Sequence, residues 1–331
     1  MSPRPCICQD PNARLTKDTL MNLAEFFKNL DPVSSTDDDL TFLLQYLKSD
    51  DIPSTDEVCC AHTLGQYHAM FALHSLASIL KGGHPDDPVP VQRIVQSWQD
   101  IKKWIQYSYT DWILRRKFIG QQKQDRVQGF NSIIPFLTAA TQIPELRDLM
   151  FSHPGEDRLL EILAFCWSIE GEAWFMETDN RFIEPQTAAR PLSTLFENEG
   201  LKQLKGTSVE VHGVLCGIAG WNPTDIARNA LTLLVKPSIA LSHRHTHLQM
   251  LILLDIIPKF SDALLAQHSI RHVTRTLSDL ASRAYNSDSS EEVAKCIVSC
   301  ITYLARSITK SITKGDESIV QWSNCHGPFD R

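Results

Sequence analysis

Residues 248–304 constrain the fold most, because they repeat one pattern: an apolar helical segment followed by a break. A dense apolar run fills residues 248–257, and Pro258 ends it, since proline is poorly tolerated inside a helix. Three further segments with apolar residues at helical spacing follow, at 260–265, 273–284 and 293–304. Helices that succeed one another after short breaks are typical of a stacked α-helical repeat.

Helical periodicity also runs along the preceding chain. It predicts helices over residues 16–30, 35–47, 57–81, 91–116, 127–140, 146–151, 159–169 and 223–235. The proline-rich residues 84–90 predict a loop, because three prolines do not fit a helix interior. Residues 209–214 alternate as a strand would, but helix is favoured there, since no second strand candidate can pair with them. The prediction is an all-α protein.

A repeated Ile-Ile-Pro motif indicates internal repeats. The two copies begin at Ile133 and Ile256, which lie 123 residues apart, or three units of 41 residues. That unit length falls within the period of roughly 40–47 residues of armadillo and HEAT repeats. The sequence therefore predicts an irregular armadillo/HEAT-like α-solenoid. We expect a disordered tail at 1–14, one helical domain over 15–310, and a last helix with a polar tail at 311–331.

Composition narrows the classes of protein. The chain has 331 residues, of which 43% are hydrophobic and 21% charged, as in ordinary folded proteins. A net charge of −7 argues against nucleic-acid and anionic-membrane partners, which both select a basic surface. No secretory signal is recognisable, and the longest apolar run is too short to cross a bilayer. Nine irregularly spaced cysteines suit reduced thiols, so we expect a cytoplasmic or nuclear location.

Several stretches of the C-terminal third resemble a known group of proteins. They are Phe-Ser-Asp-Ala-Leu-Leu at 260–265 with residues 269–274, and residues 296–304 followed by Trp322. Together they resemble uncharacterised fungal proteins in which an armadillo-like helical region precedes a C-terminal MYND-type zinc finger. The resemblance covers roughly residues 125–322 and implies an armadillo-like fold. Such a finger needs seven cysteines and one histidine, but only Cys325 and His326 follow Trp322. The finger is therefore absent, and no zinc ligand is carried over.

The histidines of His-Arg-His-Thr-His at 243–247 are the sharpest candidate for a metal site. On a helix, His243 and His247 share a face, while His245 points elsewhere. Two imidazoles four residues apart can bind a transition metal. No acid or cysteine nearby in the sequence supplies a third ligand, so the favoured interpretation is a polar helix entry after Ser242.

Weaker candidates have ordinary structural explanations. Cys59, Cys60, His62 and His68 match no zinc-finger spacing, and Cys216 beside His212 needs spatial data to count as a nucleophile. Aromatic residues between Trp98 and Trp112 alternate with basic ones, as in nucleic-acid binders, but Trp98 and Trp112 fall on an apolar stripe. The acids Glu170, Glu172 and Glu177 are interpreted as solvated residues of a loop.

The favoured function is a non-enzymatic protein-interaction scaffold of unknown pathway. No catalytic, cofactor-binding or metal-binding residue is assigned, and no membrane, small-molecule or nucleic-acid partner is expected. The acidic balance of the chain favours a basic protein partner. One alternative is an enzyme with a pocket between helices, and the other is a metal-binding module that uses His243 and His247. A closed polar cavity with a perturbed His or Cys favours the enzyme, and an open groove favours the scaffold.

Overall fold

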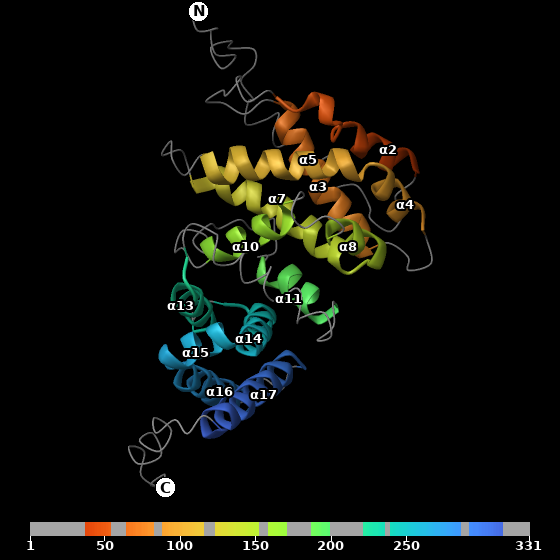
Figure 1. Ribbon diagram of the computed structural model, residues 1–331. Helices are drawn as coiled ribbons and strands as arrows, with labels where there is room; N and C mark the ends of the chain where they lie inside the picture. The colour runs from red at the N-terminus through yellow and green to blue at the C-terminus, as the bar shows by residue number, and fades with distance from the viewer. Residues whose placement is uncertain are drawn as a thin grey trace, which may run out of the picture. The chain divides into compact units, whose positions relative to one another are not determined.

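The structure of the chain is a computed structural model. It describes residues 37–53, 64–82, 88–115, 123–151, 158–170, 187–198, 221–235, 239–285 and 291–313. Every regular element in these ranges is a helix (Figure 1). The all-α prediction is therefore confirmed for this part of the chain, and none of its helices has the length and apolarity to cross a membrane. The predicted helix at 16–30 and the stretch 209–214 lie outside the described residues.

The chain divides into two compact units. Unit 1 comprises Met1–Cys166 and Glu172–Pro191, and unit 2 comprises Trp167–Gly171 and Leu192–Arg331. The sequence predicted one helical domain over 15–310. The boundary that it placed between residues 310 and 311 falls inside one helix, α17 (Glu291–Thr313).

Unit 1 is built on two long helices packed along each other, α3 (Leu64–Gly82) and α7 (Lys123–Thr141). The other helices of unit 1 are α2 (Asp37–Gln45), η3 (Ser49–Asp51), α4 (Val89–Gln96), α5 (Trp98–Ser108), the π-helical η5 (Tyr109–Arg115) and α8 (Pro144–Phe151), with the first part of α10 (Leu159–Ile169). Aromatic rings fill the core, where Trp98 stacks on Phe136 and Tyr67 meets Trp112 edge to face. The predicted apolar stripe through Trp98 and Trp112 is therefore confirmed as buried.

Two prolines mark a difference from the predicted helix boundaries. The sequence predicted a loop over 84–90 and one helix over 91–116. In the structure α4 begins at Val89, with Pro88 as its N-cap and Pro90 in its first turn. Proline is tolerated there because the first N–H groups of a helix have no partner within the helix. The single predicted helix is divided into α4, α5 and η5.

Gly129 lies where α7 closely approaches η5. A Cβ atom added to Gly129 would lie 3.0 Å from the Cβ of Trp112 and 3.3 Å from Cγ1 of Ile113. The Cβ of Trp112 is fixed to its backbone, so it cannot move away without moving η5. A glycine at this helical position therefore lets the two helices come together.

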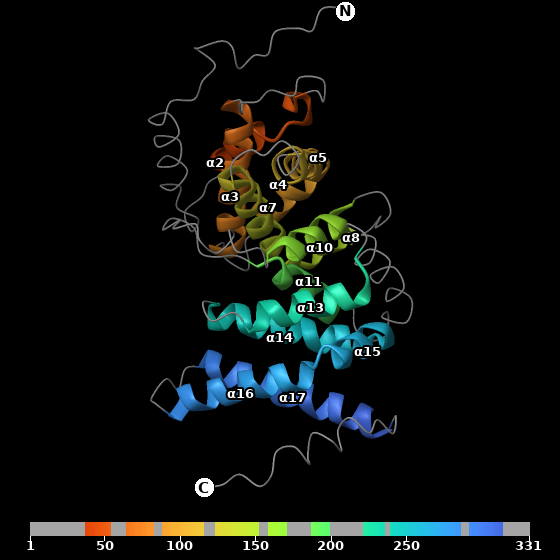
Figure 2. The same ribbon diagram turned by 90° about the vertical axis from the view of Figure 1, so that its left-hand side faces the viewer.

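Unit 2 consists mainly of two layers of helices. Its described helices are α13 (Pro223–Leu234), α14 (Leu241–Ile256), α15 (Pro258–Ala266), α16 (Ser269–Tyr285) and α17, with the end of α10 and part of α11 (Ala189–Asn198). Figure 2 shows α13, α14 and α15 in one layer and α16 with α17 in the next. A capping box begins α13: Asp225 N donates to Asn222 Oδ1 at 3.0 Å, and Asn222 N donates to Asp225 Oδ2 at 3.5 Å. The helix predicted over residues 223–235 is confirmed and ends one residue earlier, at Leu234.

The succession of helices predicted over residues 248–304 is also confirmed, with longer helices than expected. The Ile-Ile-Pro repeat is not supported. Pro135 lies inside α7, whereas Pro258 is the first residue of α15 after an extended Ile257. The two copies have different local structures, so the match does not mark equivalent positions of a repeat.

We predict that Gly129→Val destabilises unit 1 by about 1–3 kcal/mol, because the added methyl groups overpack the contact with Trp112. Thermal unfolding followed by circular dichroism measures the loss. The matched control is Gly65→Val, at an exposed position of α3. Equal melting temperatures for the two variants would contradict this account of Gly129.

Candidate functional site

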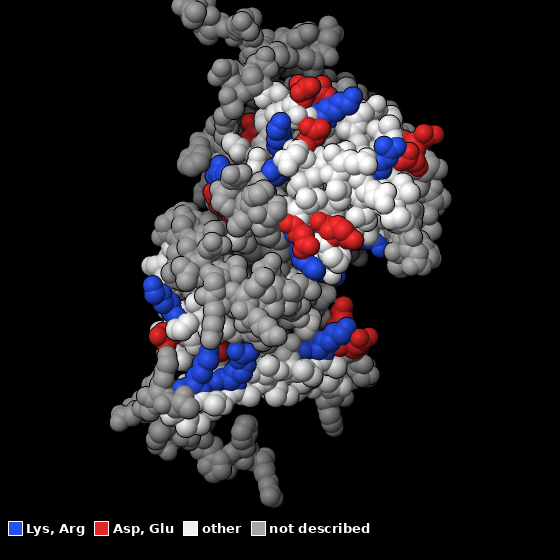
Figure 3. Space-filling model, turned by 45° about the vertical axis from the view of Figure 1, so that its right-hand side comes forward, with Lys and Arg blue, Asp and Glu red and all other residues white. Residues whose placement is uncertain are grey.

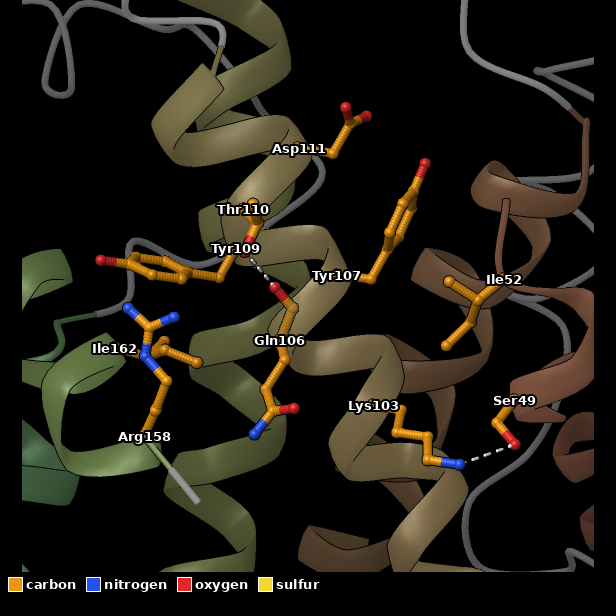
Figure 4. A pocket seen from close by; sticks show the side chains of 10 residues that line it. All are labelled: Ser49, Ile52, Lys103, Gln106, Tyr107, Tyr109, Thr110, Asp111, Arg158 and Ile162. Atoms are coloured by element: carbon orange, nitrogen blue, oxygen red, sulfur yellow. Dashed lines mark hydrogen bonds between the residues drawn. The ribbon is translucent and has the colours of Figure 1, made fainter. Parts of the chain in front are cut away.

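A surface depression of about 510 Å³ in unit 1 is the first candidate. It is lined by Ser49, Ile52, Lys103, Gln106, Tyr107, Tyr109, Thr110, Asp111, Arg158 and Ile162. Figure 4 shows the residues of α5 and η5 in the middle, with Ser49 and Ile52 on one side and Arg158 and Ile162 on the other. The lining therefore spreads over both flanks of one helical ridge and does not enclose a ligand.

The polar groups of this depression are engaged with the protein. Arg158 makes a bidentate pair with Glu161, at 2.7 and 2.9 Å, and this pair lowers the pKa of Glu161. Lys103 donates to Ser49 Oγ at 3.4 Å. Burial raises the pKa of Tyr109, whose ring packs edge to face on Phe165, so this phenol stays protonated. The lining contains neither histidine nor cysteine, and no convergent acid–base pair is formed among these residues.

Buried polar groups in unit 2 form the second candidate. Asp255 of α14 is fully buried, and Lys310 of α17 donates to its Oδ2 at 2.8 Å and to its backbone carbonyl. Ser261 of α15 donates to Asp255 Oδ1 at 2.8 Å, and Lys310 also reaches Ser261 Oγ at 3.4 Å. One carboxylate thus joins three helices. Its oxygens are satisfied by groups of the protein, which indicates a structural role.

The histidine-rich segment lies inside the first two turns of α14. The predicted sharing of a face by His243 and His247 holds, but the segment is not a polar helix entry: Arg244, Thr246 and His247 are buried. Arg244 pairs with Asp279 of α16 at 3.2 Å, and His245 Nδ1 lies 3.2 Å from Ser299 Oγ of α17. These side chains help to fix α14 against α16 and α17.

Glu170 corrects a prediction from the sequence. It was interpreted as a solvated acid, but only 6% of its surface is exposed, and its Oε1 lies 3.7 Å from Nε2 of His247. This acid is 77 residues away from His247 in the chain, so local spacing could not reveal the approach. In the described part of the chain, no group of three or more His, Cys, Asp or Glu residues is arranged to hold a metal ion. The metal hypothesis at His243 and His247 gains no third ligand from these residues.

Burial controls the titration of His247. It lowers the pKa of His247 to about 3, and the charge of His243 acts in the same direction. Removing an imidazolium from water is costly here, because the side chain of His247 is only 1% exposed. His247 is therefore neutral in the folded protein at physiological pH.

The thiols of α17 are also unreactive, because burial disfavours the charged thiolate form. Burial raises the pKa of Cys296 to about 11 and that of Cys300 to about 12, although the charge of Arg244 opposes both shifts. Cys166, Cys296 and Cys300 are all buried. The candidate thiols Cys59, Cys60 and Cys216 lie outside the described residues.

The outer face of α17 is the third candidate. Six exposed apolar residues follow one another there at intervals of four, three, four, three and four residues. We call them the α17 seam: Ala294, Val298, Ile301, Ala305, Ile308 and Ile312. Val298 is 62% exposed and Ile312 67% exposed. Alternating steps of three and four place apolar residues in one line along a helix, which is the pattern of a coiled-coil contact.

The opposite face of the same helix is the one that builds the fold. It carries Val293, Cys296, Cys300, Tyr303 and Ser307, all of which are buried. This face packs on α14 and α16. The α17 seam is thus a second apolar face that the described part of the chain leaves exposed. The sequence signal for it was present, but the heptad spacing was read only as core periodicity.

Charge and aromatic residues give little support to nucleic acid as a ligand. Trp98, Trp104, Tyr109 and Trp112 are buried and cannot stack on bases. Figure 3 shows the described basic and acidic residues interspersed on the face in view. In comparisons with protein-family models, curated proteins and solved structures, nothing matches this chain. The resemblance to armadillo-like fungal proteins stays a prediction.

We predict that Lys310→Met destabilises unit 2 by about 3 kcal/mol, because it leaves the buried carboxylate of Asp255 without a counter-charge. The urea-unfolding midpoint measures the loss. Lys295→Met removes an exposed ion pair with Glu291 and should leave the midpoint unchanged. The double variant Asp255→Leu with Lys310→Met should recover most of the loss. A double variant as unstable as Lys310→Met would contradict this explanation.

His247 makes a separate prediction about pH. The unfolded chain binds a proton at His247 near pH 6.5, while the folded chain does so only near pH 3. The contribution of His247 to the free energy of unfolding is therefore fully present above pH 6.5. It is lost as the pH falls from 6.5 toward 3, by up to about 1.4 kcal/mol per pH unit. The His247→Leu variant should show a flatter dependence of its urea midpoint on pH between those limits. His268→Asn, at an exposed histidine, should keep the slope of the natural chain.

Proposed function

We propose that this chain is a non-enzymatic protein-interaction scaffold of the irregular α-solenoid type, and that a partner binds along the α17 seam. The observation that carries the proposal is the exposure of the seam: Val298, Ile301, Ile308 and Ile312 are 62%, 53%, 38% and 67% exposed. These residues form one continuous line on one helix. Contiguous apolar surface of this kind marks interaction sites, whereas single exposed apolar residues do not.

The position of the seam in unit 2 supports the same proposal. Helix α17 packs on α14 of the neighbouring layer and on α16 of its own layer, as neighbouring elements of a solenoid do. A terminal element of a solenoid normally has a polar outer face, because nothing stacks on it. The last described helix instead carries an apolar outer face. We infer that a helix of a binding partner covers it.

The depression in unit 1 gives weaker support to the alternative of an enzyme. Its lining is spread over both sides of a helical ridge and contains neither His nor Cys. Its charged groups Lys103 and Arg158 contact Ser49 and Glu161. The scaffold accounts for the exposed apolar face, and the enzyme does not.

A photo-crosslinking amino acid placed at Ile308 tests the proposal in cells that express the full chain. We expect a discrete adduct after irradiation, because the probe lies in the covered seam. The matched control places the same amino acid at Val95 of α4, which is exposed to a similar extent, 37% against 38%. Adducts that are equal at the two positions, or absent at Ile308, would contradict binding at the seam.

A further inference from the structure

The spacing of the α17 seam is the same in both directions. From Ala294 the steps are four, three, four, three and four residues, and from Ile312 backwards they are again four, three, four, three and four. Two copies of this helix laid side by side in opposite directions therefore align every seam residue with a seam residue. The aligned line spans 18 residue steps, or about 27 Å.

The side chains that meet in this arrangement have complementary sizes. At successive heights along the helix pair, the residues that lie opposite each other are Ala294 and Ile312, Val298 and Ile308, and Ile301 and Ala305, one from each copy. An alanine thus always faces an isoleucine, and the remaining level pairs two β-branched residues. A parallel arrangement would instead place each seam residue opposite its own copy, so that Ala294 and Ala305 would give two levels with little side-chain volume. Even filling of the contact favours the antiparallel arrangement.

The flanks of the seam contain no pair of like charges in this arrangement. On one flank, Thr302 lies opposite Thr302 of the other copy, and Lys295 lies opposite Thr309 of the other copy. On the other flank, the half-buried Leu304 lies opposite Leu304 of the other copy, and Ile297 lies opposite Ser311 of the other copy. Charged residues at flanking positions are the usual means of excluding a wrong partner in a coiled coil. Here nothing at these positions excludes a second copy of the same helix.

We propose that the α17 seam binds a second copy of this chain, as an antiparallel helix pair related by a two-fold axis between Ile301 and Ala305. The proposal rests on the proposed function, because it names the partner of the same surface. In a two-fold symmetric contact both copies use the same patch, so a residue that contacts a second residue of the other copy is also contacted by it in reverse. The residue pairs of the antiparallel seam have this property. The free seam leaves four branched side chains exposed in each copy, and pairing removes them from water.

The mass of the full chain in solution tests the proposal. Sedimentation equilibrium across a wide range of concentrations should show a species of twice 37.4 kDa. Val298→Glu and Ile308→Lys should each raise the dissociation constant about 100-fold or more, because each places a charge in the apolar contact. Both positions are exposed in the single chain, so circular dichroism should show folded variants. Val235→Glu, at an exposed valine outside α17, should dimerise as the natural chain does.

Combining the two substitutions determines the direction of the helices. In the antiparallel pair, the new carboxylate at position 298 faces the new ammonium group at position 308 of the other copy, so the double variant should dimerise again. In a parallel pair, like charges face each other and the double variant stays dissociated, which overturns the proposal. The two positions are ten residues apart in one helix, about 15 Å, so they do not neutralise each other within a chain.

The results of these experiments distinguish a failure of the second copy as partner from a failure of the proposed function. A chain that is monomeric at every concentration overturns the second copy as partner, as does a dimer that Val298→Glu does not weaken. If the crosslinker at Ile308 then still captures a different protein, the interaction function stands with another occupant. If it captures nothing, both proposals fail. A crosslinked adduct of two copies of the chain, together with recovery in the double variant, supports both.

Discussion

Unit 2 depends on the interactions that the buried carboxylate of Asp255 makes with Lys310 and Ser261. A charge removed from water is tolerated only when other groups replace the lost hydration, and here Lys310 and Ser261 do so. These groups come from α17 and α15, so the requirement of one side chain on α14 fixes three helices at once. Apolar contacts alone allow helices to slide or rotate. A buried ion pair with defined hydrogen bonds does not, and it sets the rotation of α17 about its own axis.

That rotation determines which residues of α17 face solvent. With Lys310 directed at Asp255, the line from Val293 to Ser307 turns inward and the α17 seam turns outward. The inner face is closed by Arg244 and His245, which pair with Asp279 of α16 and with Ser299 of α17. The histidine-rich segment, for which the sequence favoured a polar helix entry, thus contributes contacts between the two layers.

Much of the helical architecture could be predicted from the sequence, because periodicity and capping are local. Asn222 with Asp225, and Pro258 at the start of α15, act within a few residues. Contacts between distant residues could not be predicted: Glu170 is buried against His247, and Lys310 against Asp255, across 77 and 55 residues. The Ile-Ile-Pro match misled for the same reason, because the surroundings of Pro135 and Pro258 decide whether a helix continues or begins. Heptad spacing in α17 was visible, but only burial distinguishes a seam from a core stripe.

The two faces of α17 have no residue in common. The positions that hold unit 2 together and the positions that form the seam alternate along 23 residues without sharing a side chain. A substitution at Val298 or Ile301 changes what the surface accepts and leaves the packing beneath it intact. Evolution and protein engineering can therefore redesign the specificity of this surface without a loss of folding stability.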